Sequence, residues 1–213
     1  PSRQAEPHPH ATHFGPGGQF LYVCDLGIDK VLLYPVDELA SGGGASTGVV
    51  AAELTPGSGP RHLTFSSDGT RAYLVNELSN DVVVYAVSGD DGTFEELQKA
   101  STLPPEFDGE STAAEIQLHP NGGFLYASNR GHDSVAVFSV QADDGTLTPA
   151  GYFGTTGSGP RHFQVDPSGE WCLVSNQGSD HVVSFRIDST TGLGTWTGRS
   201  IQVPEPACTE FRR

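Results

Sequence analysis

One unit of about fifty residues recurs four times along this chain, and it constrains the fold more than any other feature. Each copy is marked by a similar turn, which reads Pro16-Gly17-Gly18, Ser67-Asp68-Gly69, Pro120-Asn121-Gly122 and Pro167-Ser168-Gly169. The last residues of these turns are 51, 53 and 47 positions apart. Glycine at this place predicts a hairpin turn with positive φ, which most other residues reach only with strain.

Short apolar strands are expected on both sides of each turn. The strands before the turns cover residues 11–14, 62–65, 115–118 and 162–165, and the strands after them cover 20–23, 72–75, 124–127 and 171–174. Third strands cover 31–34, 82–85, 135–138 and 182–185, and a glycine-containing linker leads to a fourth. Four strands per unit predict an all-β fold, a β-propeller of four-stranded antiparallel blades. We expect one domain over residues 1–213, with the glycine run 42–44 as a loop between blades.

A β-sandwich is the alternative all-β fold. It gives no reason for four copies to keep their turns and aromatic residues in the same register, so the propeller is the preferred prediction.

Composition narrows the possible partners. The formal net charge is -15, which disfavours binding to nucleic acid or to an anionic membrane surface. No apolar run reaches the length of a membrane span. The three cysteines, Cys24, Cys172 and Cys208, show no CxxC spacing and favour a reducing compartment, so we expect a cytoplasmic protein. The oligomeric state is not predicted.

Two aligned columns of the repeat carry polar side chains that change from copy to copy. The first strands open with His10-Ala11, Arg61-His62, Ala114-Glu115 and Arg161-His162, and the turns after the second strands read Asp25-Leu26, Asn76-Glu77, Asn129-Arg130 and Asn176-Gln177. If the blades are radially related, both columns converge on one mouth of the channel. Three of only 11 Lys and Arg residues fall here, which indicates a site for a small anion. Glu and His beside them are candidates for general acid–base work.

Structural roles compete with this interpretation. Any single Arg or His near a strand start can pair with a neighbouring blade, and Glu115 could pair with Arg130. We expect Asn76, Asn129 and Asn176 to hold the turns through bonds to backbone, and Asp29, Asp133 and Asp180 to cap the same turns. His8, His10 and His13 lack further ligands at metal-binding spacing, so no metal site is predicted. No Gly-x-Ser-x-Gly motif supports a serine nucleophile.

Six motifs, each in phase with the repeat, resemble the lactonase family of seven-bladed β-propellers, which includes propeller-type 6-phosphogluconolactonases and carboxy-cis,cis-muconate cyclases. They are the segments 7–11 (PHPHA), 59–62 (GPRH), 76–78 (NEL), 112–116 (TAAEI), 128–131 (SNRG) and 159–163 (GPRHF). The resemblance implies seven blades, of which this chain supplies four, with the N-terminal three absent and a natural C-terminus at 203–211. It implies no metal or organic cofactor.

The resemblance also assigns roles. The cyclase-type site of one His, two Arg and one Glu matches His10, Arg61, Glu77 and Arg130 as catalytic residues, although His8 and His13 lie close to His10. Arg161, His62, His162 and Glu115 are the expected substrate-binding residues. The expected function is a lactonase of carbohydrate metabolism that hydrolyses a sugar-acid lactone, foremost 6-phosphogluconolactone. A lactone-forming muconate cycloisomerase and a non-catalytic propeller that binds an anionic ligand or protein are the alternatives.

Overall fold

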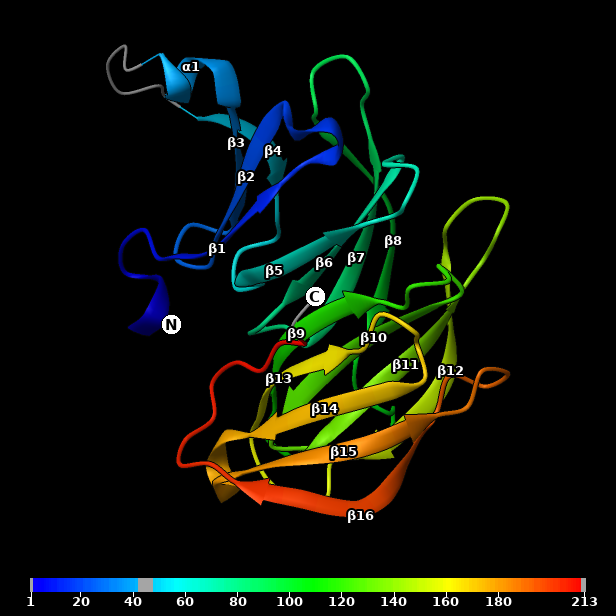
Figure 1. Ribbon diagram of the computed structural model, residues 1–213. Helices are drawn as coiled ribbons and strands as arrows, with labels where there is room; N and C mark the ends of the chain where they lie inside the picture. Colours follow the sequence, from blue (N-terminus) through cyan, green and yellow to red (C-terminus); the bar gives the residue numbers. More distant parts are fainter. Residues whose placement is uncertain (1, 42–47, 212–213) are drawn as a thin grey trace. The chain divides into compact units, whose positions relative to one another are not determined.

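The computed structural model describes residues 2–41 and 48–211 (Figure 1). Its strands form four four-stranded antiparallel sheets, each built from four consecutive strands. Blade 1 contains β1 (Pro9–Phe14), β2 (Phe20–Asp25), β3 (Lys30–Pro35) and β4 (Val49–Glu53), and blade 2 contains β5 (Pro60–Phe65), β6 (Arg71–Asn76), β7 (Asp81–Val87) and β8 (Phe94–Ser101). Blade 3 contains β9 (Thr112–Leu118), β10 (Phe124–Arg130), β11 (Ser134–Val140) and β12 (Leu147–Gly154), and blade 4 contains β13 (Pro160–Val165), β14 (Trp171–Asn176), β15 (His181–Ile187) and β16 (Gly194–Gln202).

This architecture confirms the all-β class and the four-stranded antiparallel blade. The hairpin glycines Gly18, Gly69, Gly122 and Gly169 all have φ between 69° and 76°, as their spacing predicted. Within residues 2–41 and 48–211, helical structure is limited to η1 (Ser2–Gln4), η2 (Pro16–Gly18), α1 (Val36–Ala40) and η3 (Gln177–Ser179). The sequence did not predict α1, and the glycine run 42–44 lies outside the described residues.

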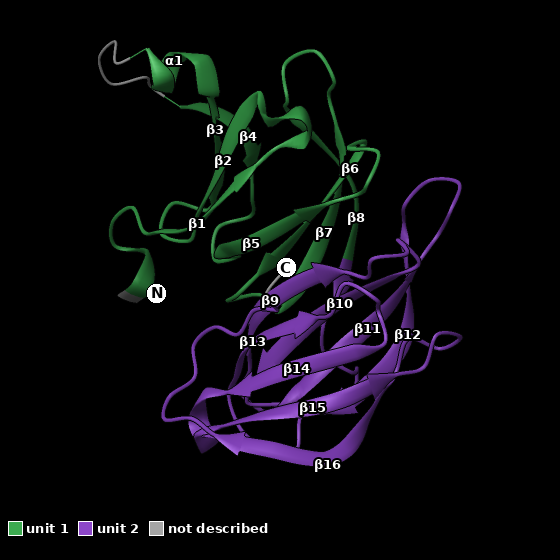
Figure 2. Cartoon of the chain, viewed as in Figure 1, with its two compact units in different colours: residues 1–99 green, residues 100–213 purple. Residues whose placement is uncertain are grey.

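The chain divides into two compact units, residues 1–99 and 100–213 (Figure 2). Each unit holds two blades and its own apolar core. In the first unit Tyr22, Cys24 and Leu74 are among the buried residues of one cluster. In the second unit Tyr126, Phe163 and Phe185 belong to another. The chain thus has two compact units, and a single propeller domain over residues 1–213 stays a prediction.

A β-bulge lies near the start of the first strand in every blade. On β1, Pro9 pairs with Asp25 and Ala11 with Cys24, so His10 is the extra residue. Arg61 on β5 and Arg161 on β13 are extra residues in the same way. On β9, Ala114 and Glu115 stand opposite the single Ser128. A bulge bends the strand and changes the direction of the side chain that it carries, as is common beside active sites. The bulged residues are therefore candidates for the functional site.

The turn between the second and third strands carries a left-handed residue in every blade. Asp29, Asn80, Asp133 and Asp180 have φ between 53° and 56°, a conformation that Asn and Asp tolerate well. The three Asp carboxylates accept the backbone N–H of the segment that follows the blade, at Gly59, Gly159 and Glu205 respectively. These aspartates therefore fix the start of the next segment, and the Asp133 carboxylate also accepts the N–H of Gly131 within its own turn.

Two of the three turn asparagines do more than hold their own turns, which is the role that we expected of all three. The side-chain amides of Asn129 and Asn176 donate to the carbonyls of Thr102 and Thr155 in the preceding linkers, while Asn76 donates to the Asp81 carboxylate. All three side chains are buried, so each of these bonds satisfies an amide N–H₂ group that solvent does not reach.

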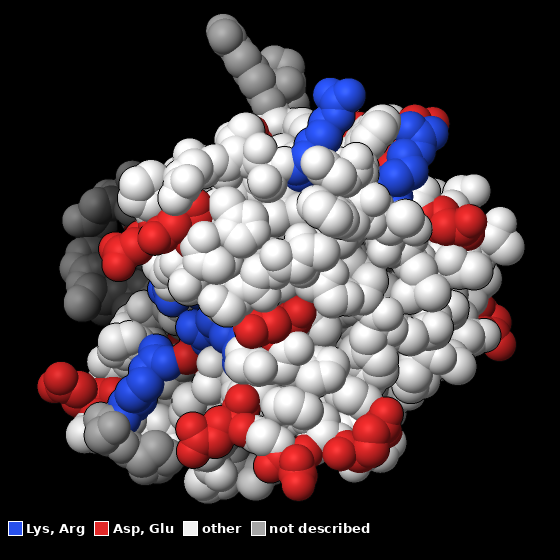
Figure 3. Space-filling model, turned by 90° about the horizontal axis from the view of Figure 1, so that it is seen from below, with Lys and Arg blue, Asp and Glu red and all other residues white. Residues whose placement is uncertain are grey.

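The surface is acidic, as the composition requires. The chain has 26 Asp and Glu residues against 11 Lys and Arg, and the acidic side chains are spread over the face drawn in Figure 3. In the described part of the chain, no helix is long and apolar enough to cross a membrane.

Candidate active site

Glu77 and Arg61 form a buried ion pair in the first unit. Arg61 sits on the bulge of β5, and Glu77 directly follows β6. The Arg61 Nε–H donates to Glu77 Oε2 at 3.0 Å, and each side chain is only 2% exposed. A buried charge is tolerated when it is paired and hydrogen-bonded, and each of these two side chains meets that condition through the other.

Backbone bonds place Glu77 at this point. Its N–H donates to the carbonyl of Gly59 at 2.8 Å, and the N–H of Gly59 donates to Asp29 Oδ1 at 2.7 Å. Gly59 has φ of +65°, and a Cβ there would lie 2.6 Å from Leu78 Cγ. Glycine is therefore required at the corner that joins Asp29 to the Glu77 backbone.

Three histidines gather on the neighbouring strands β1 and β5. The ring of His10 lies 5.1 Å from the ring of His62, centroid to centroid, and the ring of His13 lies 5.9 Å from His62. The His13 Nε2 also faces the N–H of Leu63 at 3.4 Å. His10 is half-buried on its bulge, so part of its side chain remains accessible to solvent.

Arg3 is a member of this cluster that the repeat could not reveal. It lies on η1, before the first blade, and its Nη1 is ion-paired with Glu77 Oε1. Its side chain is 44% exposed, in contrast to the buried carboxylate that it contacts. The signal was missed because column-by-column comparison of blades says nothing about residues outside the repeat.

The second unit holds a different cluster, around His162. Its Nε2 lies 3.5 Å from Glu115 Oε2, and its Nδ1 accepts from the backbone N–H of Thr209 at 3.3 Å. Glu115 is held in turn, because its N–H donates to Ser128 Oγ and its Oε1 accepts from the N–H of Ile116. Two of the expected substrate-binding residues, Glu115 and His162, are therefore brought together.

Cys208 also contacts His162, but this pair is not arranged as an activated nucleophile. The Sγ lies 3.7 Å from His162 Nε2. Since Nδ1 accepts from Thr209, the ring proton belongs on Nε2, where the imidazole cannot take the thiol proton. Burial, together with the carboxylates of Glu210 and Glu115, raises the pKa of the Cys208 thiol. A thiol of raised pKa is a poor nucleophile near neutrality.

The two remaining expected residues lie in the same unit. Arg130 ends β10 and donates from Nη2 to the carbonyl of Ala113 at 3.0 Å. Arg161 is half-buried on the bulge of β13. Both arginines therefore belong to the same unit as Glu115 and His162.

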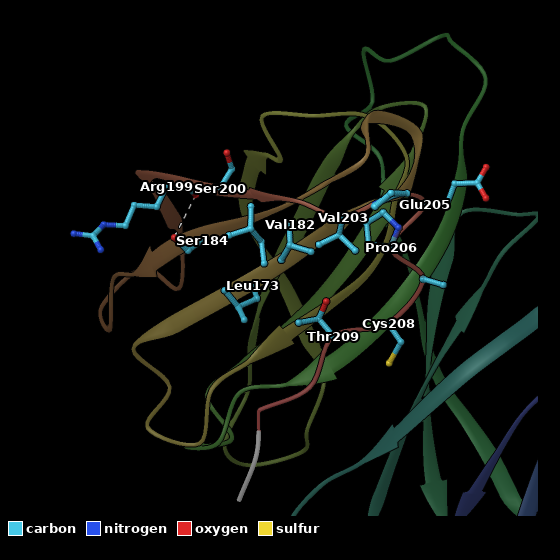
Figure 4. Close-up of a pocket in the computed structure, with 13 residues that line it drawn as sticks. Leu173, Val182, Ser184, Arg199, Ser200, Val203, Glu205, Pro206, Cys208 and Thr209 are labelled. Carbon is cyan, nitrogen blue, oxygen red and sulfur yellow. Dashed lines mark hydrogen bonds between the residues drawn. The ribbon is translucent and has the colours of Figure 1, made fainter.

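A separate groove of about 610 Å³ lies on blade 4 between β14, β15, β16 and the C-terminal tail (Figure 4). Leu173, Val182 and Val203 contribute apolar walls, and no expected site residue lines it. No group of three or more His, Cys, Asp and Glu side chains within residues 2–41 and 48–211 is arranged to hold a metal ion.

Comparisons with known proteins come from both sequence and structure. A family model described as lactonase, 7-bladed beta-propeller, matches residues 1–211. The chain is 35% identical over 209 residues to 6-phosphogluconolactonase of Bacillus subtilis (strain 168), covering 98% of this chain and 58% of that protein. It is 36% identical to the periplasmic gluconolactonase of Pseudomonas aeruginosa, with a TM-score of 0.88, covering 96% of this chain and 57% of that structure.

A protein from Lactobacillus plantarum is also 36% identical, with a TM-score of 0.87, and the match covers 96% of this chain and 58% of that structure. The chain thus spans less than two thirds of the length of the relatives that it matches.

Proposed function

Because this chain belongs to the lactonase family of seven-bladed β-propellers, we propose that it serves the hydrolysis of a sugar-acid lactone, foremost 6-phosphogluconolactone. The observation that carries the proposal is the buried Arg61–Glu77 pair beside the His10–His62 contact. This arrangement offers fixed guanidinium N–H donors for developing negative charge and an imidazole for proton transfer, which are the two needs of lactone opening.

The proposed chemistry starts with water as the nucleophile. His10 takes a proton from water as it attacks the lactone carbonyl carbon, and Arg61 stabilises the resulting oxyanion. The bond from the carbonyl carbon to the ring oxygen then breaks, and the protonated imidazole returns the proton to that oxygen. The product is a hydroxy acid, which ionises to the carboxylate.

Glu77 suits a different task from proton transfer. Both of its oxygens are held by guanidinium groups, and opposite charges favour its ionised form. We therefore assign general acid–base work to His10 and give Glu77 the task of orienting the buried Arg61. The substrate-binding roles of His62, Arg161, His162 and Glu115 and the catalytic role of Arg130 remain predictions, to be tested by substitution.

Substitution of Arg61 and Glu77 tests the proposal. Arg61→Ala should lower kcat/KM for opening 6-phosphogluconolactone by about 100-fold or more, as expected when an oxyanion donor is removed. Glu77→Gln should also lower it, because Arg61 loses its orienting partner. The measurement is lactone loss followed by NMR, with circular dichroism to confirm folding. Glu53→Gln is the matched control, since Glu53 is an exposed partner of Lys30 and should leave the rate unchanged.

The alternatives are decided by the same preparations. Cyclisation of carboxy-cis,cis-muconate faster than lactone hydrolysis would identify a cycloisomerase that uses the same residues in the lactone-forming direction. Tight binding of an anion with turnover of neither compound would identify a non-catalytic propeller. Normal lactone turnover by folded Arg61→Ala and Glu77→Gln variants would overturn the site assignment.

A cytoplasmic location is proposed on the cysteines. Cys24, Cys172 and Cys208 are all free thiols, as is typical of a reducing compartment. Because one relative is named as periplasmic, fractionation of the producing cells is the direct test.

A further inference from the structure

The Arg61–Glu77 pair cannot by itself attract an anion. The guanidinium and the carboxylate carry opposite unit charges and are hydrogen-bonded at 3.0 Å, so together they are neutral. The chain as a whole carries a formal charge of -15, which repels an anionic substrate at long range. A site that accepts a phosphorylated lactone therefore needs a local excess of positive charge.

Arg3 adds a positive charge beside this pair. Arg61 contacts Oε2 of Glu77 and Arg3 contacts Oε1, so one carboxylate lies between two guanidinium groups and these three side chains together carry one positive charge. Arg61 and Glu77 are buried, whereas the Arg3 side chain is 44% exposed. Of these three side chains, the Arg3 guanidinium is thus the one that solvent and an incoming anion can reach.

Arg3 is held in place by its neighbour Gln4. The Gln4 Nε2–H₂ group donates to the carbonyl of Leu26 at 2.9 Å and to Asp29 Oδ1 at 2.8 Å. Asp29 also accepts from the N–H groups of Gly57 and Gly59, in the segment that leads to β5 and Arg61. One buried carboxylate therefore anchors both segments that carry arginines to Glu77, and such preorganisation lowers the entropic cost of binding.

We propose that Arg3 supplies the exposed guanidinium by which the site selects a phosphorylated lactone over a neutral one. The inference rests on the proposed lactonase function and specifies its substrate class. It concerns recognition rather than chemistry, since the phosphate lies away from the lactone carbonyl. A guanidinium suits this task because it binds phosphate oxygens through several parallel N–H donors.

The test compares two lactones in the same variants. For Arg3→Gln, the ratio of kcat/KM for 6-phosphogluconolactone to kcat/KM for gluconolactone should fall about tenfold, the value of one charge-assisted hydrogen bond. Most of the fall should come from KM for the phosphorylated substrate. Arg3→Lys keeps the charge and should restore most of the ratio. Arg186→Gln is the matched control, because Arg186 is an exposed arginine paired with Glu170 in blade 4 and should not change the ratio.

Two outcomes would overturn the inference. An unchanged ratio in Arg3→Gln would show that the charge does not select the substrate. An equal loss for both lactones, with no rescue by Lys, would show that Arg3 serves only the structure of the cluster.

Failure of the proposed function is recognised separately. If the wild-type protein opens neither lactone, binding of 6-phosphogluconate and gluconate is measured by calorimetry. Arg3→Gln should then weaken 6-phosphogluconate alone by about tenfold. Absence of 6-phosphogluconate binding by wild-type protein, or equal binding by the variant, would overturn the inference as well.

Discussion

At the scale of single residues, Gly59 has the most exacting position near the site. Its φ of +65° disfavours any L side chain, and a Cβ would meet Leu78 Cγ at 2.6 Å and Cδ1 at 2.9 Å. Its carbonyl also receives the N–H of Glu77. A side chain at this point must therefore displace either Leu78 or the backbone that positions the Glu77 carboxylate.

Alanine substitutions at Gly17 and Gly59 distinguish the cost of backbone strain from the cost of displacing neighbouring atoms. Gly17 has φ of +73° with open space around it, so Gly17→Ala should cost only the left-handed strain, about 1–2 kcal/mol of unfolding free energy. Gly59→Ala should cost more, about 3 kcal/mol, and should also lower lactone turnover. Urea unfolding and kcat measure the two effects. Equal costs in the two variants, with full turnover, would contradict the role given to Gly59.

At the scale of the element, the hairpin between β5 and β6 is held by the hydrogen bonds of one titratable carboxylate. The Asp68 carboxylate accepts from the Ser66 hydroxyl at 2.6 Å and from the N–H and hydroxyl of Thr70 at 3.0 Å each. These hydrogen bonds, the one from Ser66 first, lower the pKa of Asp68 to about 2. A lowered folded-state pKa stabilises the fold above the unfolded value near 4, and the contribution is lost as the pH falls to about 2.

Asparagine at this position should abolish that pH dependence while it keeps the turn. Blade 3 carries Asn121 in the equivalent turn, where its Oδ1 accepts the N–H of Gly123 at 2.8 Å. The stability difference between wild type and Asp68→Asn, from urea unfolding, should be constant above about pH 4 and shrink towards pH 2. The reciprocal Asn121→Asp variant should gain such a dependence. If the unfolding free energies of wild type and Asp68→Asn changed in parallel with pH, the stabilising role given to the Asp68 carboxylate would be wrong.

Prediction from sequence worked best for the strands and hairpins, and it failed for features that depend on the pairing of strands. Alternating apolar residues and turn glycines give the sixteen strands and four hairpins, because both signals are local. The bulges at His10 and Arg61 depend on register between strands, which alternation alone does not report. Arg3, Cys208 and Thr209 were missed because they lie outside the repeat, and their contacts join residues distant in sequence.

The column comparison located polar side chains but could not pair them. It marked His10, Arg61 and Glu77 in the first unit and Glu115 and His162 in the second. Glu115 Oε2 lies beside His162, a pairing that the aligned columns did not suggest. Which charges meet depends on side-chain direction across neighbouring strands, and residue identity at aligned positions does not contain that information.

At the scale of the whole molecule, each compact unit has an equivalent tie between its two blades. Tyr22 on β2 donates to the carbonyl of Gly92 at 2.8 Å, and Tyr126 on β10 donates to the carbonyl of Gly192 at 3.0 Å. Both tyrosines are 1% exposed and belong to separate apolar clusters. Burial, with a smaller contribution from Asp91, raises the pKa of Tyr22 to about 12, so its hydroxyl remains a donor through the neutral range.

Removing one hydroxyl at a time should loosen one unit at a time. Tyr22→Phe leaves the Gly92 carbonyl without its donor and should lower the unfolding free energy of the first unit by about 1–2 kcal/mol. Hydrogen exchange should then accelerate in β1–β8 and stay unchanged in β9–β16, whereas Tyr126→Phe should give the reverse pattern. Each variant is the control for the other, because the chemical change is identical. If both variants accelerated exchange equally in all sixteen strands, the two cores would have to unfold as one cooperative block, and the division into two stability units would be wrong.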